Sequence, residues 1–146
     1  VPNFAGIKYT FESIYEYNQC RLYKDGKFDM LHGQDETILP SLAMGGARGG
    51  IGGTTNYNGR ELTAIIDCWN KGELEAAREH QNFSQEVINV ICRYRGNIVG
   101  GKRIMKLIGL DLGKNRTPFQ NLTDEEEQAM KRELEAIGFF DRCNVL

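Results

Sequence analysis

The feature that most constrains the fold is an alternation of short strands and helices in the first half of the chain. The patterns predict three strand–helix pairs, at 6–10 with 11–24, 28–33 with 34–44, and 45–56 with 60–71. Strands that alternate with helices form parallel sheets with helical crossovers. Because three strands with open edges cannot cover both faces of such a sheet, we expect an α/β fold whose sheet is incomplete.

The second half of the sequence is helical. Apolar periodicity predicts helices at 73–95 and 100–110, and a capping box at Thr123–Glu126 begins a last helix that Gly138 closes. The glutamate run 125–127 is typical of a solvated first turn rather than of a metal site.

Lys8 is out of place in the middle of the first strand. Burying an ammonium without a partner costs several kcal/mol, so burial would favour the neutral amine. A neutral lysine amine can attack a carbonyl and form a Schiff base. The alternative is an edge-strand lysine whose stem lies on apolar surface while its head reaches water.

Two further features allow both a functional and a plain interpretation. Six of the twelve residues in 45–56 are glycine, which suits either a strand end whose backbone approaches a ligand or a flexible loop. We favour the ligand-binding strand end because Ala47 and Ile51 lie within the stretch. His32 and His80 are consistent with a strand-end histidine and a solvated or half-buried helix residue.

The amino-acid composition excludes several classes of function. The 146 residues, 40% hydrophobic and 26% charged, indicate one soluble globular domain. A net charge of -2 gives no reason to expect nucleic acid or membrane partners. The four scattered cysteines and two histidines argue against a metal site and favour reduced thiols in a cytoplasmic protein.

Three sequence motifs, taken together, resemble those of a known enzyme family. The sequences Gly6-Ile7-Lys8-Tyr9-Thr10, Gly33-Gln34-Asp35-Glu36 and Gly50-Ile51-Gly52-Gly53-Thr54-Thr55-Asn56 resemble, in order and spacing, the second half of the N-acetylneuraminate lyases. That family belongs to the superfamily of pyruvate-dependent class I aldolases that includes dihydrodipicolinate synthase. Arg116 and Pro118, before the last helix, are similar to the family's C-terminal extension.

The resemblance implies a fold. It makes the chain the C-terminal part of a (β/α)8 TIM barrel, strands six to eight, followed by a C-terminal helical extension. Residues 1–72 would form the last three strand–helix units and residues 73–146 the extension. A whole barrel takes roughly 250 residues, so we expect the first five units to come from elsewhere, in keeping with the abrupt start at Val1.

The resemblance also implies residue roles. Lys8 corresponds to the Schiff-base lysine, which needs no cofactor and no metal. Its amine would condense with the sugar acid for cleavage to pyruvate and N-acetylmannosamine. Substrate-binding roles fall on the strand-end residues Thr10, Gly33, Asp35, Glu36, Gly52 and Gly53.

Two departures from the family affect these expectations. The lyases usually carry Ser-Thr-Tyr-Asn where this chain has Gly53-Thr54-Thr55-Asn56, so one substrate-binding hydroxyl is missing. The family's proton-relay tyrosine and carboxylate-binding loop belong to the other half. We therefore expect an N-terminal half-barrel chain as partner, and a tetramer of assembled barrels. The alternatives are another pyruvate aldolase, a dihydrodipicolinate synthase-like enzyme, and a non-catalytic half-barrel assembly module.

Overall fold

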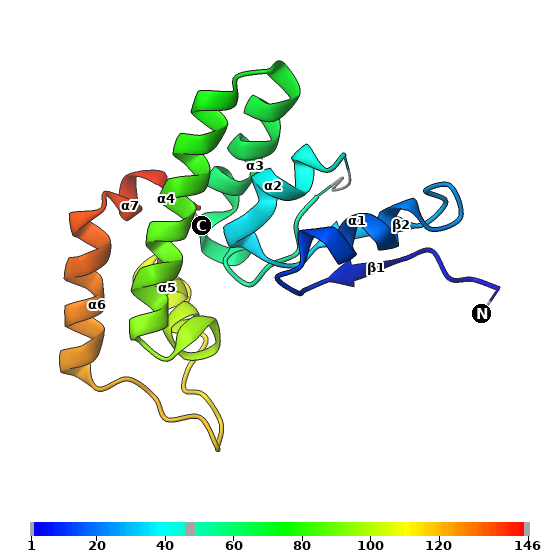
Figure 1. The fold of residues 1–146 in the computed structure, drawn as a ribbon. Coiled ribbons are helices and arrows are strands. Elements are labelled where there is room, and N and C mark those ends of the chain that lie inside the picture. Colours follow the sequence, from blue (N-terminus) through cyan, green and yellow to red (C-terminus); the bar gives the residue numbers. More distant parts are fainter. Residues whose placement is uncertain (1, 46–48, 145–146) are drawn as a thin grey trace.

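The computed structural model describes residues 2–45 and 49–144. In chain order its elements are β1 (Gly6–Tyr9), α1 (Ile14–Leu22), β2 (Asp29–His32), the 3-10 turn η1 (Asp35–Thr37), α2 (Ile38–Ala43), α3 (Thr55–Lys71), α4 (Leu74–Arg93), the π-helical turn η2 (Asn97–Gly101), α5 (Lys102–Leu107), α6 (Asp124–Ala136) and α7 (Phe139–Arg142). Strands and helices alternate at the start and helices alone follow, as the sequence predicts. Figure 1 shows β1, α1 and β2 projecting from the helical body, with the N-terminus at the far end.

β1 and β2 form a parallel pair, in which Lys8 lies opposite Leu31. Helix α1, capped by the Ser13 side chain, crosses one face of this pair. The Tyr17 hydroxyl of α1 donates to the Met30 carbonyl at 3.1 Å, and the Tyr17 ring packs against Tyr9. Because side chains alternate along a strand, Lys8 and Leu31 lie on the face away from α1.

The expectation of a third strand over 45–56 is wrong for the described residues, which pair through a single bridge between His32 and Gly50. The Ile51 N–H donates to the His32 carbonyl at 2.8 Å, so the segment still runs beside β2. Glycine offers no side chain to pack on a strand, and within residues 2–45 and 49–144 no further strand lies beyond this one. Residues 46–48 lie outside the described part of the chain.

Helices α3 and α4 form an antiparallel hairpin that closes at Gly72 (Figure 1). Gly72 has a φ of 78° and its N–H donates to the Trp69 carbonyl at 3.0 Å, so it caps the end of α3. Pro40 fits in α2 because it lies in the first turn, where a backbone N–H has no partner within the helix. A buried cluster joins α2, α3 and α4, and a larger one joins α4 to α5, α6 and α7.

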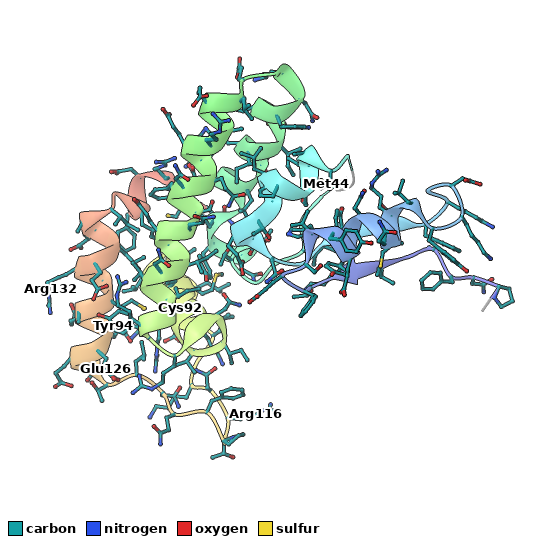
Figure 2. The ribbon with its side chains drawn as sticks, in the orientation of Figure 1. Met44, Cys92, Tyr94, Arg116, Glu126 and Arg132 are labelled. Carbon is teal, nitrogen blue, oxygen red and sulfur yellow. The ribbon has the colours of Figure 1, made fainter. Side chains whose placement is uncertain are left out.

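The capping box at Thr123 and Glu126 is confirmed, and it begins α6. Glu126 also pairs with Arg95 beyond the end of α4, at 2.7 Å. The solvated first turn expected for 125–127 is wrong at Glu127, which is buried against α5, where Lys106 pairs with its carboxylate at 2.7 Å. Arg116 lies on the loop between α5 and α6, at the opposite end of the helical body from the α3–α4 turn (Figure 2). Over the described residues no helix is both long and apolar enough to cross a membrane.

Candidate active site

The carboxyl ends of β1 and β2 bring three of the expected site residues together. The Gly33 N–H donates to the Tyr9 carbonyl at 2.7 Å, so the parallel pairing continues past β2. A Cβ on Gly33 would overlap the Thr10 hydroxyl and lie 2.8 Å from Lys8 Cε. Lys8, Thr10 and Gly33 are therefore in mutual contact range, and only glycine fits at position 33.

Lys8 is exposed in this structure, so the expectation of a buried amine is wrong for the chain as described. The reason lies in the sheet, because α1 covers only the opposite face of the β1–β2 pair. Among the described residues, the outer edge of β1 has no strand partner. Lys8 is therefore an edge-strand lysine whose head reaches water, which is the alternative that the sequence left open.

Asp35, two residues beyond Gly33, is almost fully buried, with 3% of its surface exposed. Its Oδ2 accepts hydrogen bonds from the Thr54 backbone N–H at 2.8 Å and from the Thr54 hydroxyl at 2.6 Å. A Cβ on Gly52 would overlap this carboxylate, so glycine is required there. Asp35 Oδ1 has no hydrogen-bond partner within the described chain. One oxygen of the carboxylate thus holds the start of α3, while the other is buried without a partner among the described residues.

Two glutamines of α4 hold the turn that carries Asp35 and Glu36. Gln81 Nε2 donates to the Asp35 carbonyl at 3.0 Å, and Gln81 Oε1 accepts from the Leu39 N–H at 2.9 Å. Gln85 Nε2 donates to the Glu36 carbonyl at 2.8 Å. Neither glutamine was expected from the sequence. Gln81 could have been found as a polar residue on the apolar face of α4, whereas Gln85 is exposed and gives no such signal.

A third residue that the sequence did not reveal, Asn97, lies against Gly53. A Cβ on Gly53 would overlap Asn97 Nδ2, and Asn97 Oδ1 accepts from the Tyr57 hydroxyl at 2.7 Å. Burial raises the pKa of the Tyr57 phenol far above its ordinary value, so the hydroxyl keeps its proton and remains a donor. Gly53 and Asn97 both line a cavity of about 310 Å³.

Both histidines contact side chains of other elements of the fold. His32 is fully buried, its Nε2 lies 2.7 Å from Thr37 Oγ1, and burial lowers its pKa. His80 is half-buried and lies 2.8 Å from Glu61, which also pairs with Arg142 of α7. No cluster of three potential metal-binding side chains is found among residues 2–45 and 49–144.

The expected site residues thus follow one another along the carboxyl ends of neighbouring chain segments. Lys8, Thr10 and Gly33 form one contact group, and Asp35 with Gly52 forms the next. Glu36 is half-buried beside Asp35, and Gly53 follows Gly52. The Lys8 amine is able to react with a carbonyl compound, and the carboxylates of Asp35 and Glu36 are able to accept hydrogen bonds from hydroxyl groups.

Comparison with known proteins identifies the family of this chain. The model of the dihydrodipicolinate synthetase family matches residues 1–137. The N-acetylneuraminate lyase of Sus scrofa is 30% identical over 97% of this chain and 46% of its own length. Structures of N-acetylneuraminate lyases from Proteus mirabilis and Aliivibrio salmonicida, 31% and 32% identical, each superpose with a TM-score of 0.88 over 95% of this chain and 46% of theirs. The chain spans about half the length of these relatives, and it belongs to the dihydrodipicolinate synthetase family.

Proposed function

We propose that this chain is the catalytic-lysine half of a Schiff-base aldolase that cleaves N-acetylneuraminate to pyruvate and N-acetylmannosamine. The half acts when a second set of strand–helix units completes the barrel. The relatives named above carry the lyase name and are about twice this chain's length, which supports both parts of the proposal.

The observation that carries the proposal is the position of Lys8. It projects from the face of the β1–β2 pair that α1 leaves uncovered, and this face is the interior of a barrel of the family. Its Cε lies beside Gly33 and Thr10, at the strand ends where such barrels hold their substrates. Strands supplied by the other half would enclose the amine that is exposed here.

In the proposed reaction, the Lys8 amine attacks the keto carbon of the open-chain sugar acid, and water leaves. The resulting iminium accepts the electron pair released when the carbon–carbon bond of the aldol breaks and the hydroxyl proton departs. Protonation of the enamine and hydrolysis release pyruvate and restore Lys8. The covalent intermediate provides the electron sink, so the step needs no cofactor.

The neighbouring residues would bind the substrate. Thr10 supplies a hydroxyl beside Lys8, and the carboxylates of Asp35 and Glu36 accept hydrogen bonds from the sugar hydroxyls. Gly33, Gly52 and Gly53 keep the backbone close to the substrate. Residues 1–72 would close the barrel, residues 73–146 would form its helical extension, and assembled barrels would associate further as oligomers.

Borohydride trapping tests the proposal. Reduction in the presence of pyruvate should place one adduct on Lys8 in the assembled protein, as located by mass spectrometry. The Lys8→Arg variant keeps the charge but cannot form the imine, so activity should fall at least about a thousand-fold. Lys27→Arg, on the loop before β2, is the matched control. An adduct elsewhere, or none in a folded assembly, contradicts the assignment.

Product analysis identifies the substrate. The assembled protein should release N-acetylmannosamine from N-acetylneuraminate. Condensation of pyruvate with aspartate semialdehyde instead would make the chain dihydrodipicolinate synthase-like, with the same Lys8 chemistry.

A further inference from the structure

A polar group on a different part of the chain occupies the space beside Gly53. The amide of Asn97, from the π-helical turn η2, lies where a side chain at position 53 would begin. The neighbouring Gly52 lies against the Asp35 carboxylate instead, while the oxygen of the same Asn97 amide lies against Gly101. The two adjacent glycines thus each face a polar group from another element, a carboxylate acceptor in one case and an amide donor in the other.

The Asn97 amide is held in a defined orientation. Tyr57, buried in α3, donates its hydroxyl proton to Asn97 Oδ1 at 2.7 Å. The Asn97 Nδ2 atom is consequently the end that faces Gly53. Nδ2 carries two hydrogens that it can donate, and within the described chain neither has a hydrogen-bond acceptor. The π-helical turn itself is a conformation often found at functional sites.

A cavity of about 310 Å³ opens beside this amide, lined by residues of α3, η2 and α5 together with Gly53. This volume is at the small end of the range for ligand sites, roughly 300–1,000 Å³. Polar and apolar residues share the lining, with Asn56 and Lys102 beside Ile98 and Met105. Such a cavity suits a short hydroxylated chain.

We propose that Asn97 is a specificity-determining residue for the substrate's hydroxylated tail: its amide fills the space left by Gly53 and donates a hydrogen bond to a tail bound in the adjoining cavity. Asp35 and Glu36 accept hydrogen bonds only, whereas the amide donates, so the two sides together match hydroxyl groups that both donate and accept. Tyr57 is a positioning residue, which acts through Asn97. This inference rests on the proposed function, because it concerns the substrate of the same site.

Kinetics of the assembled protein test the substrate role. Asn97→Ala should raise KM for N-acetylneuraminate about tenfold and leave borohydride trapping of pyruvate on Lys8 unchanged, because pyruvate has no hydroxylated tail. Tyr57→Phe keeps the amide but loosens it, so a smaller rise in KM is expected. Asn70→Ala, an exposed asparagine at the far end of α3, is the matched control and should leave KM unchanged.

A double-mutant cycle tests the contact between position 53 and Asn97 without any activity measurement. Gly53→Ser should lower the urea midpoint of unfolding because the new side chain meets the amide, and Asn97→Ala in the same chain should restore it. Additive effects of the two substitutions overturn the geometry. A normal Lys8 adduct with unchanged KM in Asn97→Ala overturns the substrate role alone. Absence of the adduct from the unmutated protein overturns the proposed function, and the substrate role of Asn97 with it.

Discussion

A single added methyl group at Gly52 tests how tightly the site is packed. A Cβ there would overlap the buried Asp35 carboxylate, whose Oδ2 is fixed by two hydrogen bonds from Thr54. We expect Gly52→Ala to lower the free energy of unfolding by about 1–3 kcal/mol in urea titration, the usual cost of overpacking. Gly49→Ala is the control, because nothing lies within 4 Å of its Cβ position. Equal effects of the two substitutions would contradict this packing.

His32 should make stability depend on pH. Burial lowers its pKa and the Asp35 charge only partly opposes this, so the unfolded chain takes up the proton first as the pH falls. The stabilisation is complete above the ordinary pKa of 6.5 and is lost as the pH falls through the lower folded value. The urea midpoint should therefore drop between about pH 7.5 and pH 5.5. His32→Gln should remove much of this drop and His80→Gln should retain it; a drop that follows His80 instead would contradict the assignment.

Residues of the site differ in how visible they are in the sequence. The resemblance to the lyase family predicted that Lys8, Thr10 and Gly33 belong to one site, and in the structure Gly33 lies against both Lys8 and Thr10. The burial of Lys8 could not be predicted correctly, since it depends on what covers the second face of the sheet. Asn97 could not be found either, because its contact with Gly53 exists only once η2 packs against the start of α3.

At the level of elements, α4 controls the position of the acidic turn. Gln81 joins the Asp35 carbonyl to the buried N–H of Leu39, in the first turn of α2. Gln81→Ala leaves both backbone groups without this partner, so we expect a loss of about 1–3 kcal/mol in the free energy of unfolding and a higher KM. Gln85→Ala, whose single hydrogen bond to the Glu36 carbonyl is exposed, should cost less. A larger effect from Gln85 would show that the outer contact, not the buried one, fixes the turn.

Elements with their own local signals were predicted well. The capping box at Thr123 and Glu126 begins α6, and Gly138 follows its end with a φ of 72°, as local backbone chemistry dictates. The strand expected at 45–56 lacked such a signal, because glycine has a low strand propensity and offers no side chain to pack on a sheet. The described residues of this segment pair with β2 through a single bridge, between His32 and Gly50.

At the scale of the whole molecule, the β1–α1 side carries apolar surface. A cavity of about 400 Å³ there is lined by Phe4, Ile7, Cys20, Tyr23, Phe28 and neighbouring residues, and its lining is almost entirely apolar. It lies beside the strand edge that has no partner among residues 2–45 and 49–144. Apolar surface next to an open strand edge favours association. In a complete barrel the preceding strand–helix unit would cover both.

Assembly with the other half should therefore remove this surface and restore chemistry at Lys8 together. We expect the chain alone to bind an apolar dye and to give no borohydride adduct with pyruvate. Adding a chain with the first five strand–helix units of a family barrel should lower dye fluorescence several-fold and produce the adduct. Tyr23→Arg changes a residue that lines the apolar cavity. It should weaken assembly more than Leu110→Arg, the same kind of change on the loop after α5. If the chain instead forms a stable homo-oligomer that does not bind the added half, a non-catalytic assembly module is favoured, because further copies of this chain would then cover the apolar cavity.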